Sequence, residues 1–247
     1  MKNTAIIIPT RLGAQRFPNK PLAKINNVPM IIHVLNRAKK SNVRNVLIAT
    51  PDNEIIKVIE KNGGKAILTS PNHTSGSDRV YEVYKKELKD KNNFNLIINL
   101  QGDMPNIEPN SISKLVKLMR NNTCDIGTLA SHIKNKKDIN NPNIVKVSTN
   151  QMLEDNSFLV AKDFFRTTDD LKSEKMYHHI GIYAFTNLSL EKYVNFSKSK
   201  LELERNLEQM RAMDNNLSIK VGLCNSSPLS VDTKEDLINV SKEMINI

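Results

Sequence analysis

Residues 9–22 read Pro9-Thr10-Arg11-Leu12-Gly13-Ala14-Gln15-Arg16-Phe17-Pro18-Asn19-Lys20-Pro21-Leu22. They follow a short apolar run at 5–8, whose length and branched side chains predict a buried strand that opens a sheet. Prolines at both ends and in the middle restrict this loop, which carries the cations Arg11, Arg16 and Lys20. Open α/β sheets bind ligands beyond the carboxyl ends of their parallel strands. The loop therefore predicts a polyanion site, with a nucleoside triphosphate as the natural candidate.

Strands and helices alternate through the first half of the chain. The sequence predicts buried strands at 46–49 and 96–100 and a short strand at 65–68. It predicts helices at 30–38, from a cap at Asp52 to Gly63, and at 78–88. This alternation predicts an α/β fold with a mostly parallel, Rossmann-like sheet and helices on both faces.

The pattern changes from about Asn143. Strands are expected at 144–149, 158–161 and 179–185, then a helix at 199–213, a strand at 218–223 and a closing helix from Thr233. Polar turns between these strands indicate an antiparallel excursion. We therefore expect one α/β domain over 1–247, with an antiparallel subdomain at about 143–200.

The overall charge suggests anionic partners, because 36 Lys and Arg against 26 Asp and Glu give +10. The lysines are spread over predicted helices, however, and aromatic residues make up only 5% of the chain. No basic block interleaved with aromatics is present, so a nucleic-acid platform is not expected.

Cys124 and Cys224 stand alone in the sequence, without a spacing suited to zinc. No apolar run approaches the roughly 18 residues of a membrane span, and the run at 5–8 is too short for a signal peptide. We expect a cytoplasmic protein with no membrane partner.

Glycine-rich phosphate motifs are absent: no Gly-x-Gly-x-x-Gly and no Gly-x-x-x-x-Gly-Lys-Ser/Thr occurs. Phosphates would then be held by side-chain cations. Asn19 tolerates a left-handed backbone and can take the place of a loop glycine.

Asp103 is the strongest acidic candidate, because Gln101-Gly102-Asp103 follows the strand at 96–100. A carboxylate beside phosphates repels them unless Mg²⁺ lies between, so the position favours a metal ligand over an ordinary turn residue. Asp232 alone is better explained as the N-cap of the last helix, with Glu235 completing the cap.

Two further segments are ambiguous. Residues 73–79 form a loop-to-helix junction suited to a base edge or a phosphate, but a simple cap at Ser77 explains them equally well. On the helix at 199–213, Leu203, Leu207 and Met210 predict an apolar stripe, and Glu208 could form a surface ion pair with Arg211.

Taken together, seven segments resemble the signatures of the sugar-acid cytidylyltransferases, in the same order and over nearly the whole chain. They lie at 9–22, 73–79, 99–105, 141–147, 179–183, 207–211 and 231–237. The loop, for example, resembles the family's Pro-Ala-Arg…Arg-Leu/Phe-Pro-Gly-Lys-Pro-Leu.

The resemblance implies a GT-A-like nucleotidyltransferase fold and transfer of CMP from CTP to the anomeric hydroxyl of 3-deoxy-manno-octulosonate (Kdo). Pyrophosphate would leave, and the product would serve lipopolysaccharide synthesis. It also implies a homodimer formed through the second half, and two Mg²⁺ ions, one held by the protein and one carried with CTP.

The resemblance also implies residue roles. Lys20, Asp103 and Asp232 would be catalytic, with the two aspartates holding Mg²⁺. The implied nucleotide-binding residues are Pro9, Arg11, Arg16, Lys20, Ser75 and Gly76. The implied sugar-acid-binding residues are Arg79, Gln101, Lys162, His179, Tyr183, Glu208 and Gln209.

Three positions depart from the family pattern: Asn19 replaces a glycine, Met104 an acidic residue, and Lys162 an arginine. Lysine lacks the guanidinium fork that grips a carboxylate at two points. The alternative is therefore a cytidylyltransferase for another ulosonic acid, such as 8-amino-Kdo or a nonulosonic acid. A non-catalytic nucleotide-binding module is a further alternative, and a basic nucleic-acid binder is the third.

Overall fold

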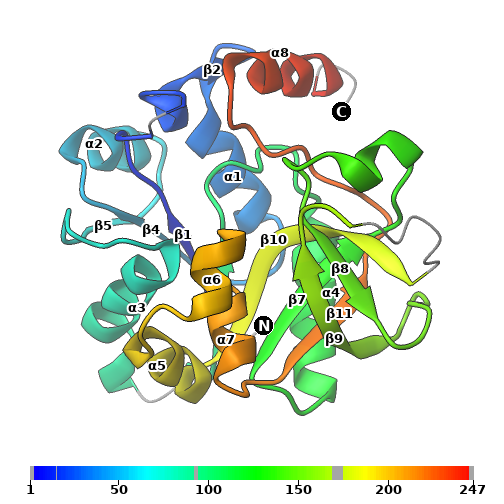
Figure 1. Ribbon diagram of the computed structural model, residues 1–247. Helices are drawn as coiled ribbons and strands as arrows, with labels where there is room; N and C mark the ends of the chain where they lie inside the picture. Colours follow the sequence, from blue (N-terminus) through cyan, green and yellow to red (C-terminus); the bar gives the residue numbers. More distant parts are fainter. Residues whose placement is uncertain (1–2, 15, 92–93, 169–174, 245–247) are drawn as a thin grey trace. The chain divides into compact units, whose positions relative to one another are not determined.

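The computed structural model describes residues 3–14, 16–91, 94–168 and 175–244 (Figure 1). The chain divides into two compact units, one formed by 1–113 with 228–247 and one formed by 114–227. The second unit covers a longer stretch of sequence than the subdomain expected at about 143–200. None of the helices in the described ranges is long and apolar enough to cross a bilayer.

The first unit contains a parallel sheet in the order β5-β4-β1-β6. Its strands are β1 (Thr4–Pro9), β4 (Asn45–Thr50), β5 (Ala66–Leu68) and β6 (Leu96–Leu100). β1 and β6 are buried along their whole length. This is why they read as continuous apolar runs without alternation.

Helices α1 (Met30–Lys39), α2 (Asn53–Lys61) and α3 (Gly76–Glu87) connect these strands. Crossovers between parallel strands are right-handed. The steps from β1 to β4 to β5 therefore put α1 and α2 on one face, and the return to β6 puts α3 on the other (Figure 1). The expected α/β class is confirmed.

The remaining elements of this unit are short, apart from the last helix. They are η1 (Lys20–Leu22), the hairpin β2 (Lys24–Ile25) and β3 (Val28–Pro29), η2 (Lys89–Lys91) and α8 (Lys234–Glu243). The division between the units falls within α4 (Pro109–Asn121).

The second unit is built on five strands with mixed pairing. They are β7 (Ile126–Ser131), β8 (Lys146–Thr149), β9 (Phe158–Phe165), β10 (Met176–Thr186) and β11 (Ile219–Leu223). β7 and β11 are parallel, and the other pairs are antiparallel. Because β8 pairs with both β9 and β10, the pairings close on themselves. The 3₁₀ helix η3 (Lys136–Asn140) and helices α5 (Asn187–Asn195), α6 (Lys200–Arg205) and α7 (Met210–Asp214) complete the unit.

The prediction of a single helix at 199–213 is wrong, because this segment forms the two helices α6 and α7. α6 ends at Arg205, and its C-cap Asn206 adopts a left-handed conformation with φ 51°. Asparagine accepts this conformation more readily than most residues, and it reverses the chain before α7. Leu203, expected in an apolar stripe, is 64% exposed, whereas Leu207 and Met210 are buried.

Lys146 is fully buried in the second unit. Its ammonium donates to the carbonyls of Asn141 at 2.9 Å and Ile144 at 2.7 Å, and also to that of Arg166. These bonds replace the water that a buried charge loses. Lys146 thus ties the turn before β8 to the end of β9.

A hydrophobic cluster in the first unit joins the loop after β1 to the end of the chain. Phe17, Ile25 and Met30 pack with Val231 and Val240, and all five are at most 7% exposed. Residues 229–244 are therefore held against the loop by apolar burial.

We expect Val231→Ala to lower the free energy of unfolding by about 2 kcal/mol, because it leaves a cavity at a fully buried position. Ile238→Ala is the matched control on α8, where Ile238 is 55% exposed, and should change stability by less than about 0.5 kcal/mol. Urea titrations of the two variants check this. Equal losses would show that Val231 is not held in a well-packed core.

Candidate active site

A cavity of about 230 Å³ opens in the first unit where β1 and β6 end and α3 begins. The residues around it come from four segments of the chain, 9–14, 20–21, 73–79 and 101–103. They are Pro9, Thr10, Arg11, Ala14, Lys20, Pro21, His73, Thr74, Ser75, Gly76, Arg79, Gln101, Gly102 and Asp103. It lies at the sheet edge where ligands of open α/β sheets bind.

Two glycines let these segments approach closely. A Cβ added at Gly102 would lie 3.0 Å from the carbonyl oxygen of Pro9, and one at Gly76 would lie 3.3 Å from Cγ of Pro9. Larger residues would push α3 and the end of β6 away from β1. The glycines therefore set the width of the cavity.

Asp103 and Asp232 converge on one ammonium group. Nζ of Lys20 lies 3.2 Å from Oδ2 of Asp103 and 3.3 Å from Oδ1 of Asp232. The Lys20 side chain is 14% exposed, so this shared contact is largely shielded from water. The two aspartates, 129 positions apart in sequence, thus face the same point.

Asp232 does not cap the last helix, so the interpretation favoured by its segment alone is wrong. Thr233 is the N-cap of α8 and forms a capping box with Asp236. The backbone N–H of Val231 donates to the carbonyl of Asp103 at 2.9 Å. This bond fixes the chain beside Asp103 and leaves the Asp232 carboxylate available to the site.

The loop cations have different surroundings. Arg11 and Lys20 line the cavity, whereas Arg16 pairs with Oδ2 of Asp232 at 3.0 Å and is 64% exposed. Asn19 has φ 58°, the left-handed conformation that the sequence predicts for it. The backbone N–H of Leu12 donates to the carboxylate of Asp52 at 2.8 Å. That carboxylate therefore stabilises the loop and makes no capping bond to α2.

Ser75, and not Ser77, is the N-cap of α3 and accepts a hydrogen bond from the N–H of Asp78. Arg79, one turn further on, is 3% exposed. It donates to the hydroxyl of Thr69 and to the carbonyl of Ser70. Burial, and next the charge of Arg11, lower the pKa of Arg79.

Gln101 is oriented by a chain of amides. Its Nε2 donates to Oδ1 of Asn99 at 2.9 Å, and Nδ2 of Asn99 donates to the hydroxyl of Ser77 at 3.2 Å. The amide of Gln101 is therefore held at the cavity edge.

In the second unit, His179 is buried beside Thr128, with 3.0 Å between its Nε2 and the Thr128 hydroxyl. That hydroxyl also lies 2.7 Å from the carbonyl of Ile182, to which it donates. The hydroxyl oxygen can therefore accept a hydrogen bond from Nε2–H, which leaves Nδ1 of the neutral ring as an acceptor. Burial, and next the charge of His178, lower the pKa of His179 to about 3.

Tyr183 stacks near His179, with 5.4 Å between ring centroids. Burial, and next the charge of Glu208, raise the pKa of Tyr183. Oε1 of Glu208 is buried and has no hydrogen-bond partner among the residues that the structure describes. A buried acceptor without a partner is costly, which is typical of a site completed by a ligand. Gln209 follows directly and is 7% exposed.

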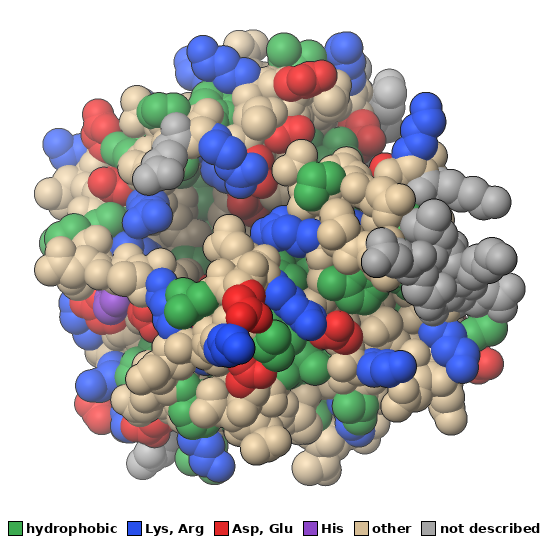
Figure 2. Space-filling view, viewed as in Figure 1, with side chains coloured by type: hydrophobic (Ala, Val, Ile, Leu, Met, Phe, Trp, Pro, Cys, Tyr) green, Lys and Arg blue, Asp and Glu red, His purple; other side chains and the backbone are tan. Residues whose placement is uncertain are grey.

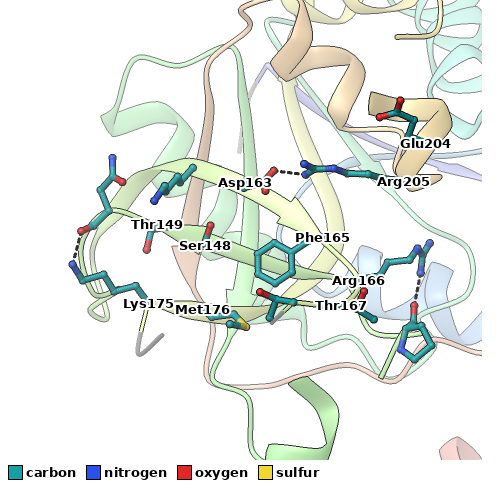
Figure 3. Close-up of a pocket in the computed structure, with 14 residues that line it drawn as sticks. Ser148, Thr149, Asp163, Phe165, Arg166, Thr167, Lys175, Met176, Glu204 and Arg205 are labelled. Atoms are coloured by element: carbon teal, nitrogen blue, oxygen red, sulfur yellow. Dashed lines mark hydrogen bonds and ion pairs between the residues drawn. The ribbon is translucent and has the colours of Figure 1, made fainter. Parts of the chain in front are cut away.

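Lys162 lies elsewhere in the second unit, on the exposed side of β9. It lines a cavity of about 790 Å³ that does not include His179, Tyr183, Glu208 or Gln209. Figure 3 shows this cavity, in which Arg205 pairs with Asp163 at 2.5 Å. Its lining mixes four basic and two acidic side chains.

Comparison with known proteins identifies the family. A cytidylyltransferase family model matches residues 5–219. The chain belongs to the cytidylyltransferase family. It is 40% identical to a 3-deoxy-manno-octulosonate cytidylyltransferase from Bartonella tribocorum, over 96% of each chain. It is 41% identical to one from Brucella canis, over 95% of this chain and 92% of the relative.

Solved structures agree. A CMP:2-keto-3-deoxy-manno-octonic acid synthetase complexed with CTP matches with a TM-score of 0.88 and 32% identity, over 98% of both chains. A 4-diphosphocytidyl-2C-methyl-D-erythritol synthase from Anaerococcus prevotii matches with a TM-score of 0.65 and 17% identity, over 99% of both chains. At that identity the second likeness concerns the fold alone.

The two aspartates of this cytidylyltransferase fit a magnesium ion. Among the described residues no group of three or more His, Cys, Asp or Glu gathers as a metal cluster. Mg²⁺ commonly takes only one or two carboxylates and completes its shell with water and substrate phosphates. Asp103 and Asp232, which both reach Lys20 Nζ, supply that number.

Sequence reasoning missed several residues that support the site. Glu82 accepts hydrogen bonds from the loop before α3. Arg211, expected in a surface pair with Glu208, is instead buried and forms an ion pair with Glu202. Arg211 also lies over the ring of Tyr193, whose hydroxyl donates to the carbonyl of Glu208. Asn206, a residue type that accepts the left-handed conformation at helix C-termini, is the signal that could have revealed the early end of α6.

The pH dependence of stability checks the burial of His179. Because its folded pKa of about 3 lies below the unfolded value of 6.5, the unfolded chain alone binds the proton between them. Stability is therefore lost as pH falls below 6.5. We expect the wild type to lose about 2 kcal/mol more than His179→Gln between pH 7.5 and 5.0, measured by urea denaturation. Equal losses in both proteins would contradict a buried neutral His179.

Proposed function

We propose that this protein transfers CMP from CTP to the anomeric hydroxyl of Kdo, giving CMP-Kdo and pyrophosphate. The observation that carries the proposal is the convergence of Asp103 and Asp232 on Lys20 Nζ, beside a cavity lined by further basic groups. The names of the relatives support CTP and Kdo as the substrates.

CTP would bind in the cavity of the first unit. Arg11 and Lys20 supply the charge that its phosphates need, and Arg16 assists from the rim. Pro9, Ser75 and Gly76 border the same cavity and would contact the nucleoside, with Ser75 and Gly76 toward the cytosine.

The reaction is an in-line displacement at the α-phosphorus. The anomeric oxygen of Kdo forms the new P–O bond, the bond to the β-phosphate breaks, and the hydroxyl proton passes to solvent. Mg²⁺ bound by Asp103 and Asp232 would lower the pKa of that hydroxyl and neutralise phosphate charge, while a second ion would accompany CTP. Lys20 and Arg11 orient the triphosphate, and such orientation supplies much of the rate of phosphoryl transfer.

Gln101 and Arg79 of the first unit are proposed sugar-acid-binding residues, and the other members of the proposed set belong to the second unit. Nδ1 of His179 can accept a hydrogen bond from a sugar hydroxyl, and the buried Oε1 of Glu208 is a further acceptor for sugar hydroxyls. Tyr183, Gln209 and Lys162 complete this proposed set. Arg79 is 3% exposed, and Lys162 lines a separate cavity.

We also propose a homodimer, acting in the cytoplasm for lipopolysaccharide synthesis. Most of the exposed large apolar side chains lie in the second unit: Met152, Val160, Leu188 and Leu203. The buried Cys124 and Cys224 form no disulfide with each other, which suits a reducing compartment. Sedimentation equilibrium should give twice the chain mass of 28.0 kDa; a monomer mass at micromolar concentration would contradict the dimer.

Nucleic-acid binding is not favoured. On the face shown in Figure 2, Lys and Arg side chains are interspersed with Asp and Glu and form no continuous stripe. Such a stripe is the electrostatic footprint of a nucleic-acid binder.

The test is pyrophosphate release with each of the four nucleoside triphosphates and a panel of ulosonic acids. We expect turnover with CTP and Kdo, and Asp103→Asn to lower kcat by at least on the order of 100-fold, because a charged metal ligand is lost. Binding of Mn²⁺, followed by its EPR signal, should weaken in the same variant.

Asp90→Asn is the matched control, because Asp90 is an exposed aspartate of the first unit outside the cavity. Turnover with a different ulosonic acid in preference to Kdo would favour the alternative substrate. Near-normal turnover of Asp103→Asn would remove Asp103 from the metal role, and CTP binding without turnover would favour a nucleotide-binding module.

A further inference from the structure

One face of α3 carries a continuous stripe of polar side chains. Ser75, Arg79, Glu82 and Lys86 are spaced four, three and four positions apart, which places them on the same side of a helix. All four bond to backbone or side chains of the segment from 68 to 78 or to each other. The stripe therefore holds the segment that joins β5 to α3.

Glu82 is the centre of this stripe. Its Oε2 accepts from the backbone N–H of Ser70 at 2.9 Å and bonds to Nε2 of His73. Its Oε1 accepts from Nζ of Lys86 at 2.6 Å. One carboxylate, 20% exposed, thus contacts three donors from two segments.

The Ser70 peptide groups are held from both sides. The N–H binds Glu82, and the carbonyl accepts from Arg79 at 3.0 Å. Lys86 in turn donates to the carbonyl of Leu68 at 3.2 Å. The backbone at the end of β5 therefore follows the surface of α3.

This segment forms one wall of the nucleotide cavity. His73, Thr74, Ser75 and Gly76 all line that cavity, whereas Glu82 does not. Glu82 is linked to this wall by two contacts. One is with His73, which itself lines the cavity, and the other is with Ser70, three residues before His73. A change at Glu82 therefore reaches the cavity through the position of the wall, and its charge also acts on Arg79, which lines the cavity.

The carboxylate is ionised under ordinary conditions. Burial raises the pKa of Glu82, but the hydrogen bonds from Lys86, the Ser70 N–H and His73 outweigh burial and lower the pKa to about 2. Hydrogen bonds to an ionised acceptor are stronger than those between neutral groups. The wall is therefore held by charge-assisted bonds.

We propose that Glu82 is a positioning residue for nucleotide binding, whose carboxylate fixes residues 70–76 in the conformation that receives CTP. The inference rests on the proposed function, because it takes the cavity to be the CTP site. The residues that Glu82 holds most directly precede Ser75 and Gly76, which are proposed nucleotide contacts, whereas its link to the proposed sugar-acid residue Arg79 runs through the carbonyl of Ser70. Loss of the Glu82 carboxylate should therefore affect the KM for CTP more than the KM for the sugar acid.

The test is Glu82→Gln, which keeps the size of the side chain but replaces one acceptor oxygen by an NH₂ group that faces other donors. We expect the KM for CTP and the Kd for CTP, measured by calorimetry without sugar acid, to rise about tenfold. The KM for the sugar acid and kcat at saturating CTP should stay within about twofold.

Glu87→Gln is the matched control on the same helix. Glu87 pairs with the exposed Lys65 and does not line the cavity, so its loss should leave the KM for CTP unchanged. If Glu82→Gln does not fold, Glu82→Asp replaces it; its shorter side chain cannot reach Ser70 and His73 together, and we expect a threefold to fivefold rise.

The proposal is overturned if folded Glu82→Gln binds CTP as Glu87→Gln does, or if both KM values rise equally. Its failure can be told from failure of the proposed function. A wild type that binds CTP but transfers CMP to no ulosonic acid would contradict the proposed function without contradicting the role of Glu82 in CTP binding.

Discussion

The packing of Val231 against the loop after β1 is the interaction on which the candidate site depends. Val231 is fully buried with Phe17 and Ile25, and its N–H binds the carbonyl of Asp103. The side chain fixes the returning chain to the loop, and the backbone bond fixes it to the end of β6. Asp232, the next residue, then has no freedom to lie far from Asp103. The apolar packing of Val231 thus determines where the Asp232 carboxylate lies relative to Asp103.

The charges at this position balance one another before any ligand binds. Lys20 contacts both aspartates, and Arg16 contacts Asp232 from the solvent side. Two carboxylates facing one point would repel each other without these partners. The same cations are available to phosphates, so the site can exchange one set of ion pairs for another when a polyanion enters.

Much of this arrangement could be predicted from the sequence because it depends on local rules. The buried strands β1 and β6 show as apolar runs, and the loop cations and Asp103 follow them directly. The role of Asp232 could not be derived from its own segment, since a capping aspartate and a site aspartate look alike there; the neighbouring Thr233 takes the cap. Only the family resemblance indicated that Asp232 lies beside Asp103. The contacts of Glu82 depend on how a loop folds back on a helix, which periodicity does not encode.

The first unit is assembled from two separate stretches of the chain, 1–113 and 228–247. During translation the parallel strands and the basic loop leave the ribosome long before the segment that carries Asp232. Domains often begin to fold while synthesis continues, yet here the pair of aspartates is complete only when the last helix has emerged. A product cut short before Pro228 would lack Asp232 and also Val231 and Val240, which pack against the loop after β1. Premature termination would thus remove the second acidic group and the apolar support of the basic loop together.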